Sequence, residues 1–565
     1  MMRYEFLITW AVGLLLFTCL FATALAADAP GIEKLDIPIA AGPFEPTRKS
    51  LGDGVDGKAP AWFREGKIGL WLHWGPQAMG RSGDWYAKFL YYQHDDWTNR
   101  NCYANHIANF GHPSKVGYKD VLALWKPTKW DPAKLMDIYK KAGVRYVLAM
   151  GVHHDNFDLW NSKYQPWNAT RIGPKRDIVA GWQHAAKKEG IRFGVSFHMD
   201  YSWWWWQCAF MNDTDGPLKG VPYDAAVNYD GQDTWWKKLG LNLKDLYGIS
   251  LADELQPAGS DPRKDFWSFV PEELKNKEYA RWYCNKWYHR VQDVVDNYKP
   301  DFIYFDGNSY PFSGTGTGRG IKTDATTRII AHHYNASIAR SGKLEVMAFT
   351  KGAEDARAVA RASESGFPEG IKRDQPWMYE NGLGEWFYQS GTYHDSSMVI
   401  HSILEAVARD GNYTLNIPLT PEGELDPGGL KTLEDMGAWL KVNGAGIYGS
   451  KAWDVWREGT VTMGGGNLNE THAHTPYTAA DIRFTVGKDG ALYAYAMAWP
   501  EDGKLILRTL AIPAGKITDV RLLGSRAKLA WQQTDGGLVV TPPAKRPCDY
   551  AYGLKVTGVS LKPAP

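Results

Sequence analysis

Asp306 stands where a short apolar strand is expected to leave the core of the protein. The segment YKPDFIYFDGN, residues Tyr298 to Asn308, reads as a helix end, a proline break, the apolar run 302–305 and then the acid. Asp-Gly is a common turn pair in which the aspartate side chain bonds to the backbone, and this is the simpler interpretation. A carboxylate in this position could also act as a catalytic nucleophile or base.

The second carboxyl group that glycoside hydrolysis would need lies further along the chain. In that reaction one carboxylate serves as nucleophile or base, while another carboxyl group is kept protonated and serves as acid. The segment RASESGFPEG offers Glu364 and Glu369 for the second role. Either could instead be an ordinary surface glutamate. Together with Asp306, these residues make glycoside hydrolysis the chemistry that the pattern favours.

Histidines are the next candidates, for binding either a metal or a sugar: His73, His153, His154 and His198. Adjacent side chains of a strand point to opposite sides, so one metal cannot take both His153 and His154 unless the strand has already ended. The sequence has no H-E-x-x-H motif either. We therefore expect no metal here, and interpret the imidazoles as ligands of sugar hydroxyls, with indoles as a stacking wall.

The elements that must position these residues form a long alternating series. From about Ala61 to Gly449, short β-rich runs alternate with amphipathic helical patterns, as expected of parallel βα units. A series this long favours an α/β fold of the TIM-like (β/α)8 type over an open sheet, and no G-x-G-x-x-G follows the first strand. Catalytic residues of such barrels lie at the carboxyl ends of the strands. The polar residues of this chain fall at those ends: His73, His153, His154, His198, Asp306 and Lys351.

The pattern places individual elements within this barrel. Apolar strands are predicted at residues 67–75, 144–155, 191–200, 301–307, 343–350 and 412–418. Helices are predicted at residues 131–143, 177–190, 276–298, 325–342, 396–411 and 429–444. The first of these helices opens with Asp131 and Pro132, which suit the cap and first helical position, and it ends at a glycine.

A long irregular insertion, residues 201–269, interrupts the barrel series. It is rich in Trp, Asp and Gly, and loops of this length in compact domains are usually functional. It contains four consecutive tryptophans, Trp203–Trp206. Core packing is the simpler interpretation, but four consecutive side chains cannot all face inward from one element. We therefore expect at least one at the mouth of the site.

The two ends of the chain differ from the barrel. Residues 450–565 show short alternating strands with Asp-Gly and Gly-Gly turns, which predict an antiparallel β-sandwich without chemistry of its own. Residues 1–26 contain Arg3, an apolar run and Ala-Leu-Ala, and are predicted to be a signal peptide, so that the protein is exported to the periplasm or secreted. The run could also cross a bilayer as an uncleaved anchor. Residues 27–60 form a lead-in to the barrel.

Composition limits the partners of the protein. A chain of 565 residues suits two or three domains. Its formal net charge of +1 gives no reason to expect nucleic acid or an anionic membrane surface as a partner. The 27 Trp and 30 Tyr are in excess, which is common in sugar-binding proteins and also in large cores. Export would permit disulfides, but the sequence does not pair the cysteines at positions 102, 208, 284 and 548.

Several separate segments then resemble a known family. They are WFREGKIGLWLHWG, PTKWDPAKLMDIYKKAGVRYVLAMGVHHDNFDLWNSKY, GPKRDIVAGWQHAAKKEGIRFGV, YKPDFIYFDGN and GNYTLNIPLTPEGEL. In this order they are similar to glycoside hydrolase family 29, the α-L-fucosidases, from about Trp62 into the terminal sandwich. The resemblance implies a retaining exo-hydrolase that releases terminal α-L-fucose through a covalent glycosyl-enzyme and uses no metal or organic cofactor.

The resemblance also implies roles for individual residues. Asp306 in YFDG matches the family nucleophile. Glu364, upstream of PWMYENGLGEW, fits the acid/base best, followed by Glu369 and then Glu354. Residues that hold the fucose hydroxyls or lie near its C6 methyl group are matched by His73, His153, His154 and Trp386.

The pocket departs from the family pattern at several positions. Asp84 and Trp85 in GDWY fall on the family's EWY, so a shorter carboxylate replaces Glu. Tyr304 stands where the family usually has Trp, and His198 lies near the position of its Tyr. Lys351 stands near a family Arg, so a point charge replaces a planar fork.

These departures leave the identity of the sugar undecided between fucose and a related sugar. Retained chemistry with an altered pocket is consistent with a related sugar such as α-L-galactose, or with fucose in a substituted polysaccharide. A catalytically inactive carbohydrate-binding relative is the alternative from another class. Such a protein would have little reason to keep Asp306 in a desolvated place, so we expect an enzyme whose partner is a fucosylated glycan or polysaccharide.

Overall fold

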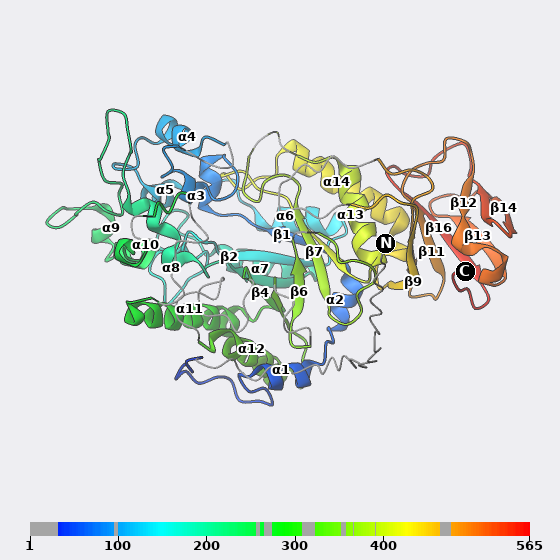
Figure 1. The fold of residues 1–565 in the computed structure, drawn as a ribbon, viewed down its shortest axis with the longest axis horizontal. Helices are drawn as coiled ribbons and strands as arrows, with labels where there is room; N and C mark the ends of the chain where they lie inside the picture. The colour runs from blue at the N-terminus through cyan, green and yellow to red at the C-terminus, as the bar shows by residue number, and fades with distance from the viewer. Residues whose placement is uncertain are drawn as a thin grey trace, which may run out of the picture.

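The computed structural model describes residues 32–94, 100–255, 260–264, 274–307, 323–351, 357–364, 366–389, 391, 393–463 and 476–564. The expected signal peptide and the candidate acid Glu354 lie outside these ranges. Within them the chain forms a closed eight-stranded barrel followed by two antiparallel sheets. Figure 1 shows an elongated molecule with the C-terminal sheets, in orange and red, at one end.

The barrel consists of parallel strands that pair in sequence order. Each strand bonds to the next and β1 bonds to β8, which closes the sheet. The strands are β1 (Ile68–Leu72), β2 (Tyr146–Val152), β3 (Arg192–Phe197), β4 (Phe302–Phe305), β5 (Met347–Thr350), β6 (Ala360–Ser363), β7 (Trp377–Gly382) and β8 (Asn412–Asn416). The predicted (β/α)8 barrel is confirmed, and β6 and β7 are strands that the apolar pattern does not reveal.

β6 and β7 lack the apolar run that marks the other strands. β6 reads Ala-Arg-Ala-Ser, and β7 reads Trp-Met-Tyr-Glu-Asn-Gly. Pairing on both sides stabilises them despite this weak local preference, since a strand propensity mainly reflects packing against neighbours. The described residues that connect them, 366–376, contain no helix, so the βα alternation is interrupted at this point.

Six long helices lie at the predicted positions. They are α6 (Pro132–Lys141), α7 (Ile178–Glu189), α11 (Lys277–Tyr298), α12 (Ala325–Ser341), α13 (Ser396–Ala408) and α14 (Pro427–Asn443). The Asp131 carboxylate accepts from the backbone N–H groups of Ala133 and Lys134, which otherwise lack partners in the first turn. α7 ends at Gly190, whose φ of 68° is a left-handed conformation that glycine adopts at little cost.

Shorter helices lie in the connections around the barrel. They are α1 (Arg48–Val55), α2 (Ala61–Gly66), α3 (Tyr86–Phe89), α4 (Cys102–Asn109), α5 (Tyr118–Leu124), α8 (Ser202–Trp205), α9 (Trp235–Lys238) and α10 (Leu243–Tyr247), with the 3-10 helices η1 (Pro76–Gly80), η2 (Trp206–Phe210) and η3 (Ala252–Glu254). Figure 1 shows α3–α5 and α8–α10 at the same end of the molecule, opposite the C-terminal sheets. The β1–β2 and β3–β4 connections therefore enlarge the same side of the barrel.

The four consecutive tryptophans are all buried, which corrects the expectation that at least one lies at the mouth of the site. Trp203 and Trp204 expose 2% and 1% of their surface, and Trp205 and Trp206 expose 0%. All four can be buried because other elements surround the segment on several sides: Trp204 contacts Tyr201, whereas Trp206 contacts Tyr91 and Tyr247. Trp205 packs against the ring of His154, with centroids 5.9 Å apart, so the insertion supports the site from behind.

Alternation along β4 carries Asp306 into the mouth of the barrel. Phe302 and Tyr304 belong to the apolar cluster inside the barrel, whereas Ile303 and Phe305 pack outward. Successive side chains of a strand point to opposite faces. The next inward position after Tyr304 is therefore Asp306. The same period leads from Phe349 to Lys351 after β5 and from Ala362 to Glu364 after β6, as it does from Trp71 to His73 after β1.

The C-terminal part is built from two antiparallel sheets that share one apolar core. The larger has the order β13-β16-β11-β10-β9 and the smaller β12-β15-β14. The strands are β9 (Lys451–Glu458), β10 (Ile482–Val486), β11 (Leu492–Ala496), β12 (Leu505–Leu507), β13 (Ile517–Leu522), β14 (Ala530–Thr534), β15 (Gly537–Thr541) and β16 (Tyr552–Gly558), with 3-10 helices η4 (Gly444–Gly446), η5 (Arg508–Leu510) and η6 (Ile512–Ala514). The predicted all-β C-terminal domain is confirmed.

Two further features concern the environment of the protein. The cysteines at positions 102, 208, 284 and 548 are free thiols, and the first three are buried. Among the helices of the described residues, none combines the length and the hydropathy needed to cross a membrane.

Candidate active site

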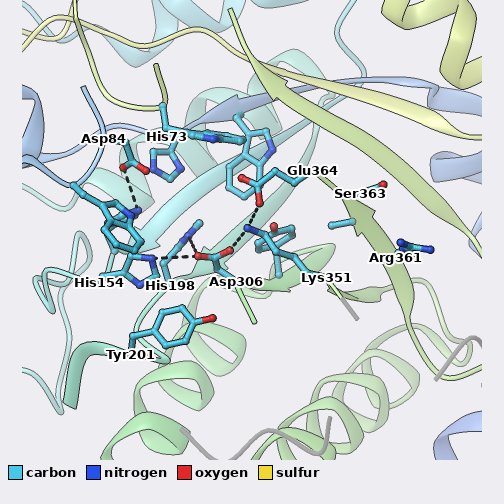
Figure 2. A pocket seen from close by; sticks show the side chains of 16 residues that line it. His73, Asp84, His154, His198, Tyr201, Asp306, Lys351, Arg361, Ser363 and Glu364 are labelled. Carbon is cyan, nitrogen blue, oxygen red and sulfur yellow. Dashed lines mark hydrogen bonds and ion pairs between the residues drawn. The ribbon is translucent and has the colours of Figure 1, made fainter. Parts of the chain in front are cut away.

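A cavity of about 410 Å³ lies at the carboxyl end of the barrel strands. The structure places all eleven predicted site residues around it: His73, Asp84, Trp85, His153, His154, His198, Tyr304, Asp306, Lys351, Glu364 and Trp386. Figure 2 shows the side chains of His73, Asp84, His154, His198 and Glu364 around the space above Asp306. Glu369, the second candidate for the acid, is exposed and does not line the cavity. The other lining residues are Trp71, Tyr201, Arg361, Ala362 and Ser363.

Asp306 is surrounded by groups that stabilise its ionised form. Its carboxylate lies 3.1 Å from His198 Nδ1 and 3.4 Å from His154 Nε2, and it also contacts the Lys351 ammonium group. Burial alone would raise the pKa of this carboxyl, but the nearby Lys351 charge and the imidazole contacts hold the pKa well below its usual range. Asp306 is therefore a buried anion with fixed donors around it.

The proton of His198 can be placed from its partners. Burial lowers the pKa of His198, so the ring is neutral near pH 7. Asp306 only accepts, so His198 Nδ1 must carry the hydrogen that faces it. Nε2 then accepts from the Ser196 hydroxyl, 3.0 Å away. Ser196 lies on β3, two residues before His198 and on the same face of the strand. It therefore orients the ring toward Asp306.

His153 is oriented in the same way by Gln77. The Gln77 side-chain oxygen accepts from the Ala87 backbone N–H (3.3 Å), which directs the amide nitrogen toward His153 Nδ1, 2.7 Å away. His153 Nδ1 is thus an acceptor, and the hydrogen sits on Nε2, which faces the Asp84 carboxyl at 3.8 Å. Burial holds the pKa of His153 well below its ordinary value, so this ring is neutral too.

Ligand atoms of His73, Asp84 and His153 lie within 4.8 Å of one another, close enough to suggest a metal site. A histidine that binds a metal normally donates its other ring N–H to an acceptor. Here the other nitrogen of His153 accepts from the Gln77 amide, and its Nε2 carries a hydrogen that would have to leave. The arrangement suits a hydroxyl group, which can both donate and accept, better than a cation.

Lys351 joins two carboxyl groups. Its ammonium nitrogen contacts both Asp306 and Glu364, and its backbone N–H donates to the Gly307 carbonyl (3.2 Å). Burial would lower the pKa of Lys351, but the two carboxylates raise it well above its ordinary value. Two oxygens that share one nitrogen lie no more than two hydrogen-bond lengths apart, on the order of 5–6 Å.

Glu364 and Asp306 are shifted in opposite directions. Burial raises the pKa of Glu364, and the Asp306 charge raises it further, while the adjacent Lys351 ammonium opposes both. A pair of titratable groups whose environments separate their pKa values is a common arrangement for a base or nucleophile and an acid. The cavity therefore holds one carboxyl that stays ionised and another that keeps its proton more readily.

The opposite wall of the cavity carries Asp84 and Trp85. Burial raises the pKa of Asp84 to about 8, so this carboxyl is largely protonated at neutral pH. Its backbone N–H donates to Glu385 (3.3 Å), which is held in turn by an ion pair with Arg100 at 2.5 Å. The Trp85 ring stands edge-to-face to that of His154, with centroids 5.5 Å apart.

Aromatic rings form the floor. Trp71 lies 4.9 Å from Tyr304 and 5.4 Å from Trp386 between ring centroids, both edge-to-face. Trp386 also contacts His73, at 5.0 Å between centroids. Beneath them lies Glu380, whose carboxyl accepts from Trp71 Nε1 (3.0 Å) and contacts the Tyr304 hydroxyl (2.7 Å).

Sequence reasoning missed several of these residues. Glu380 sits in PWMYENGLGEW, where no continuous apolar run marks the strand. An inward period of two from Met378 would have found it. Ser196 and Gln77 carry no motif, and only the orientation of the histidines reveals them. Trp71 could have been found, because it lies two residues before His73.

Comparison with known proteins agrees with this geometry. The family model described as alpha-L-fucosidase matches residues 33–445, and the alpha-L-fucosidase C-terminal domain model matches residues 475–557. The tissue alpha-L-fucosidase of Rattus norvegicus is 24% identical over 564 residues, with 98% of each chain covered. That of Homo sapiens is 24% identical, covering 88% of this chain and 89% of its own.

Solved structures show the same fold. The Thermotoga maritima alpha-fucosidase in complex with fucose has a TM-score of 0.60 at 20% identity, covering 91% of this chain and 100% of its own. An alpha-L-fucosidase GH29 from Bacteroides thetaiotaomicron has a TM-score of 0.57 at 17% identity, covering 93% and 99%. With the family model spanning the whole barrel, the chain belongs to the α-L-fucosidase family of glycoside hydrolases.

Proposed function

We propose that this enzyme is an exo-acting, retaining α-L-fucosidase in which Asp306 is the nucleophile and Glu364 the acid/base. The observation that carries the proposal is the pair of buried carboxyl groups, shifted in opposite directions, that share one lysine. Retaining glycosidases place these groups about 5–5.5 Å apart, whereas inverting enzymes leave room for a water. Two hydrogen bonds to one nitrogen keep the nearest oxygens of the two carboxyls closer together than an inverting enzyme requires, which supports retention.

In the first step Asp306 attacks C1 of the sugar. The C1–O bond to the aglycone breaks, and its electron pair passes to the leaving oxygen, which takes the proton of Glu364. A carboxylate oxygen of Asp306 forms the new bond to C1. His198 and His154 hold that carboxylate in place, so little reorganisation is needed when the bond forms.

In the second step Glu364 changes from acid to base. Once Asp306 is an ester, its negative charge no longer raises the pKa of Glu364, while Lys351 still lowers it. Glu364 then accepts a proton from water, the water oxygen bonds to C1 and the bond from C1 to Asp306 breaks. The shared lysine therefore helps to reset the pair between the two steps.

The hydroxyl groups of the sugar meet His73, Asp84 and His153. The His153 Nε2 hydrogen donates, and the Asp84 carboxyl can both donate and accept while it keeps its proton. Trp386 and Trp71 offer apolar ring surface for the C–H face of the sugar. Fucose is the proposed sugar because of the family, and the Thermotoga maritima relative was solved with it.

The experiment that tests the proposal is release of nitrophenol from aryl α-L-fucoside and aryl α-L-galactoside. Wild type is expected to prefer the fucoside, and Asp306→Ala to lose at least about 10⁴-fold in kcat. With Asp306→Gly, added azide should restore turnover and give the azide of inverted anomeric configuration. With Glu364→Gly, azide should give the retained configuration, since the nucleophile is still present.

Glu369→Ala is the matched control, because Glu369 is the exposed second candidate for the acid. Its kcat should equal that of wild type, and Glu354→Ala extends the comparison to the third candidate. The assignment would be rejected if Asp306→Gly gave the azide of retained anomeric configuration. It would also be rejected if Glu369→Ala lost the kcat expected to depend on the acid. Preference for the galactoside would change the proposed sugar to α-L-galactose but leave the proposed mechanism unchanged. No turnover of either glycoside, nor of fucosylated polysaccharides, would favour an inactive binding relative.

We also propose that residues 1–26 direct export and are then removed. The apolar run that follows Arg3 and the Ala-Leu-Ala at residues 24–26 support this. N-terminal sequencing of the mature protein should find a chain that starts at Ala27. A chain that keeps residue 1 would contradict removal.

A further inference from the structure

Glu380 is a third carboxyl group in the barrel, and the mechanism above does not use it. It lies on β7, exposes 0% of its surface and stands one layer below the cavity. Met378, two residues earlier, belongs to the apolar cluster inside the barrel, so Glu380 also points inward. A carboxyl group in such a place is costly unless it is paired or neutral.

Its two oxygens reach two different strands. Oε2 accepts from Trp71 Nε1 at 3.0 Å, from β1, and Oε1 lies 2.7 Å from the Tyr304 hydroxyl, on β4. Both rings line the sugar cavity, and they touch edge-to-face at 4.9 Å between centroids. Glu380 thus ties together two rings of the floor that no backbone bond connects, since β1 pairs with β2 and β8.

The charges around Glu380 favour its neutral form. The strand beside it on β8 presents Thr414, which is uncharged. From the ends of β4, β5 and β6 it faces Asp306, Lys351 and Glu364, and the lysine already contacts both other carboxyls. Burial and the Glu364 charge raise the pKa of Glu380 to about 8.

We propose that Glu380 is a positioning residue whose two carboxyl oxygens hold Trp71 and Tyr304 in the floor of the sugar pocket. Oε2 accepts from the Trp71 indole N–H and Oε1 accepts from the Tyr304 O–H, so both carboxyl oxygens have a partner. It acts on the sugar only through these two rings. The effect of this residue on sugar binding rests on the proposed function, whereas its contacts with the two rings do not.

A spectroscopic test does not depend on turnover. In protein labelled with ¹⁵N-tryptophan, the Trp71 indole resonance is assigned by its absence in Trp71→Phe. It should be constant below pH 7 and move with a midpoint near pH 8 as Glu380 ionises. In Glu380→Gln it should not move. A resonance that is constant in wild type up to pH 9.5, or that moves with a midpoint below pH 6, would overturn the neutral form.

A binding test addresses the role in the pocket. Calorimetry with L-fucose, and with L-galactose if that sugar is preferred, should give Glu380→Gln an affinity within about threefold of wild type, because the amide copies the hydrogen bonds of a neutral acid. Glu380→Ala should bind at least about tenfold more weakly, since the rings lose their anchor. Tyr304→Phe removes one anchor contact without opening a cavity, and it should weaken binding in wild type but not further in Glu380→Ala.

Thr414→Val is the matched control. Thr414 is the partner of Glu380 in the sheet, and its hydroxyl contacts Tyr146 (2.8 Å) and Met378 rather than the floor of the pocket. Its sugar affinity should equal that of wild type. The positioning role would be overturned if Glu380→Ala bound the sugar as tightly as wild type. It would also be overturned if Thr414→Val weakened binding as much as Glu380→Ala does, or if Glu380→Gln bound as weakly as Glu380→Ala. If wild type binds neither sugar, the proposed function fails, and the indole titration still decides the state of Glu380.

Discussion

The two sides of Asp306 are held by different physics. On the β2–β3 side, the neutral His198 ring points a fixed N–H group at the carboxylate and is itself held by Ser196, and His154 Nε2 faces the same carboxylate. On the β5–β7 side there is one ammonium group, Lys351, among three buried carboxyl groups, counting Asp306 itself. The first side holds Asp306 through the direction of its hydrogen bonds, and the second through the balance of charge around Lys351.

This difference separates two requirements of the proposed reaction. The nucleophile must not move, and a donor of fixed direction such as the neutral His198 ring meets that requirement without changing its own charge. The acid must lose and regain a proton, and charge coupling to Lys351 and Asp306 lets its pKa change during the cycle. Substitutions on the β5–β7 side should therefore change protonation, whereas those on the β2–β3 side should mainly change alignment.

The largest effect is expected when the shared cation is removed. In Lys351→Met, the buried Asp306 loses the ammonium group that most strongly opposes the effect of burial on its pKa. We expect kcat/KM to fall about 10³-fold, a loss of about 4 kcal/mol. Because Asp306 must be ionised to attack, a raised pKa should also move the acid limb of the kcat/KM profile to higher pH.

Lys351→Arg is the control for this prediction, since it keeps the charge but changes the shape of the group. Its acid limb should stay near that of wild type even if its rate falls. An unchanged acid limb in Lys351→Met would show that the histidines alone keep Asp306 ionised, and the contrast between the two sides would disappear.

A smaller effect concerns stability and the Glu380 carboxyl. Its pKa is raised from 4.5 to about 8 in the folded protein, chiefly because burial disfavours the anion. The unfolded chain releases this proton above about pH 4.5, so folding becomes less favourable as the pH rises from there to about 8. Glu380→Gln removes that penalty and should increase the free energy of unfolding by on the order of 2–3 kcal/mol at pH 7.

The measurement is denaturant unfolding at pH 4, 5.5 and 7. The gain from Glu380→Gln should be near zero at pH 4 and grow toward pH 7. Glu369→Gln, at an exposed position, should change stability at none of these values. A gain that is equal at all three pH values would mean that the carboxyl titrates alike in the folded and the unfolded chain, and so that burial has not shifted its pKa.

The β2–β3 side and the nucleophile were accessible from the sequence, whereas much of the β5–β7 side was not. Asp306, His154 and His198 each end an apolar strand, so the period of two and the rule for barrel strand ends find them. β6 and β7 have no apolar run, because short strands paired on both sides need little local preference. Their inward residues, including Glu380, were therefore invisible to a search for apolar periodicity. Glu364 was offered by the sequence only together with Glu369, and the family resemblance placed it first.

Orientation is the second part that sequence does not supply. His153 and Gln77 are 76 positions apart, and no spacing rule predicts that an amide directs the tautomer of that ring. The same limit applies to Trp203–Trp206, which are all buried because other elements surround the segment on several sides. Such details depend on the packed tertiary structure.

The smallest expected effect tests the alignment side through Ser196. In Ser196→Ala, His198 Nε2 loses the hydroxyl that donates to it at 3.0 Å, although Asp306 still favours the hydrogen on Nδ1. We expect kcat/KM to fall about three- to tenfold, near 1 kcal/mol, with an unchanged acid limb. Ser402→Ala removes another fully buried hydroxyl, on α13, and should leave kcat/KM as in wild type. In a His198→Phe background Ser196→Ala should have no further effect, because the serine acts only through that ring. A shifted acid limb in Ser196→Ala would mean that this side also sets the charge of Asp306, and that direction and charge are not divided between the two sides.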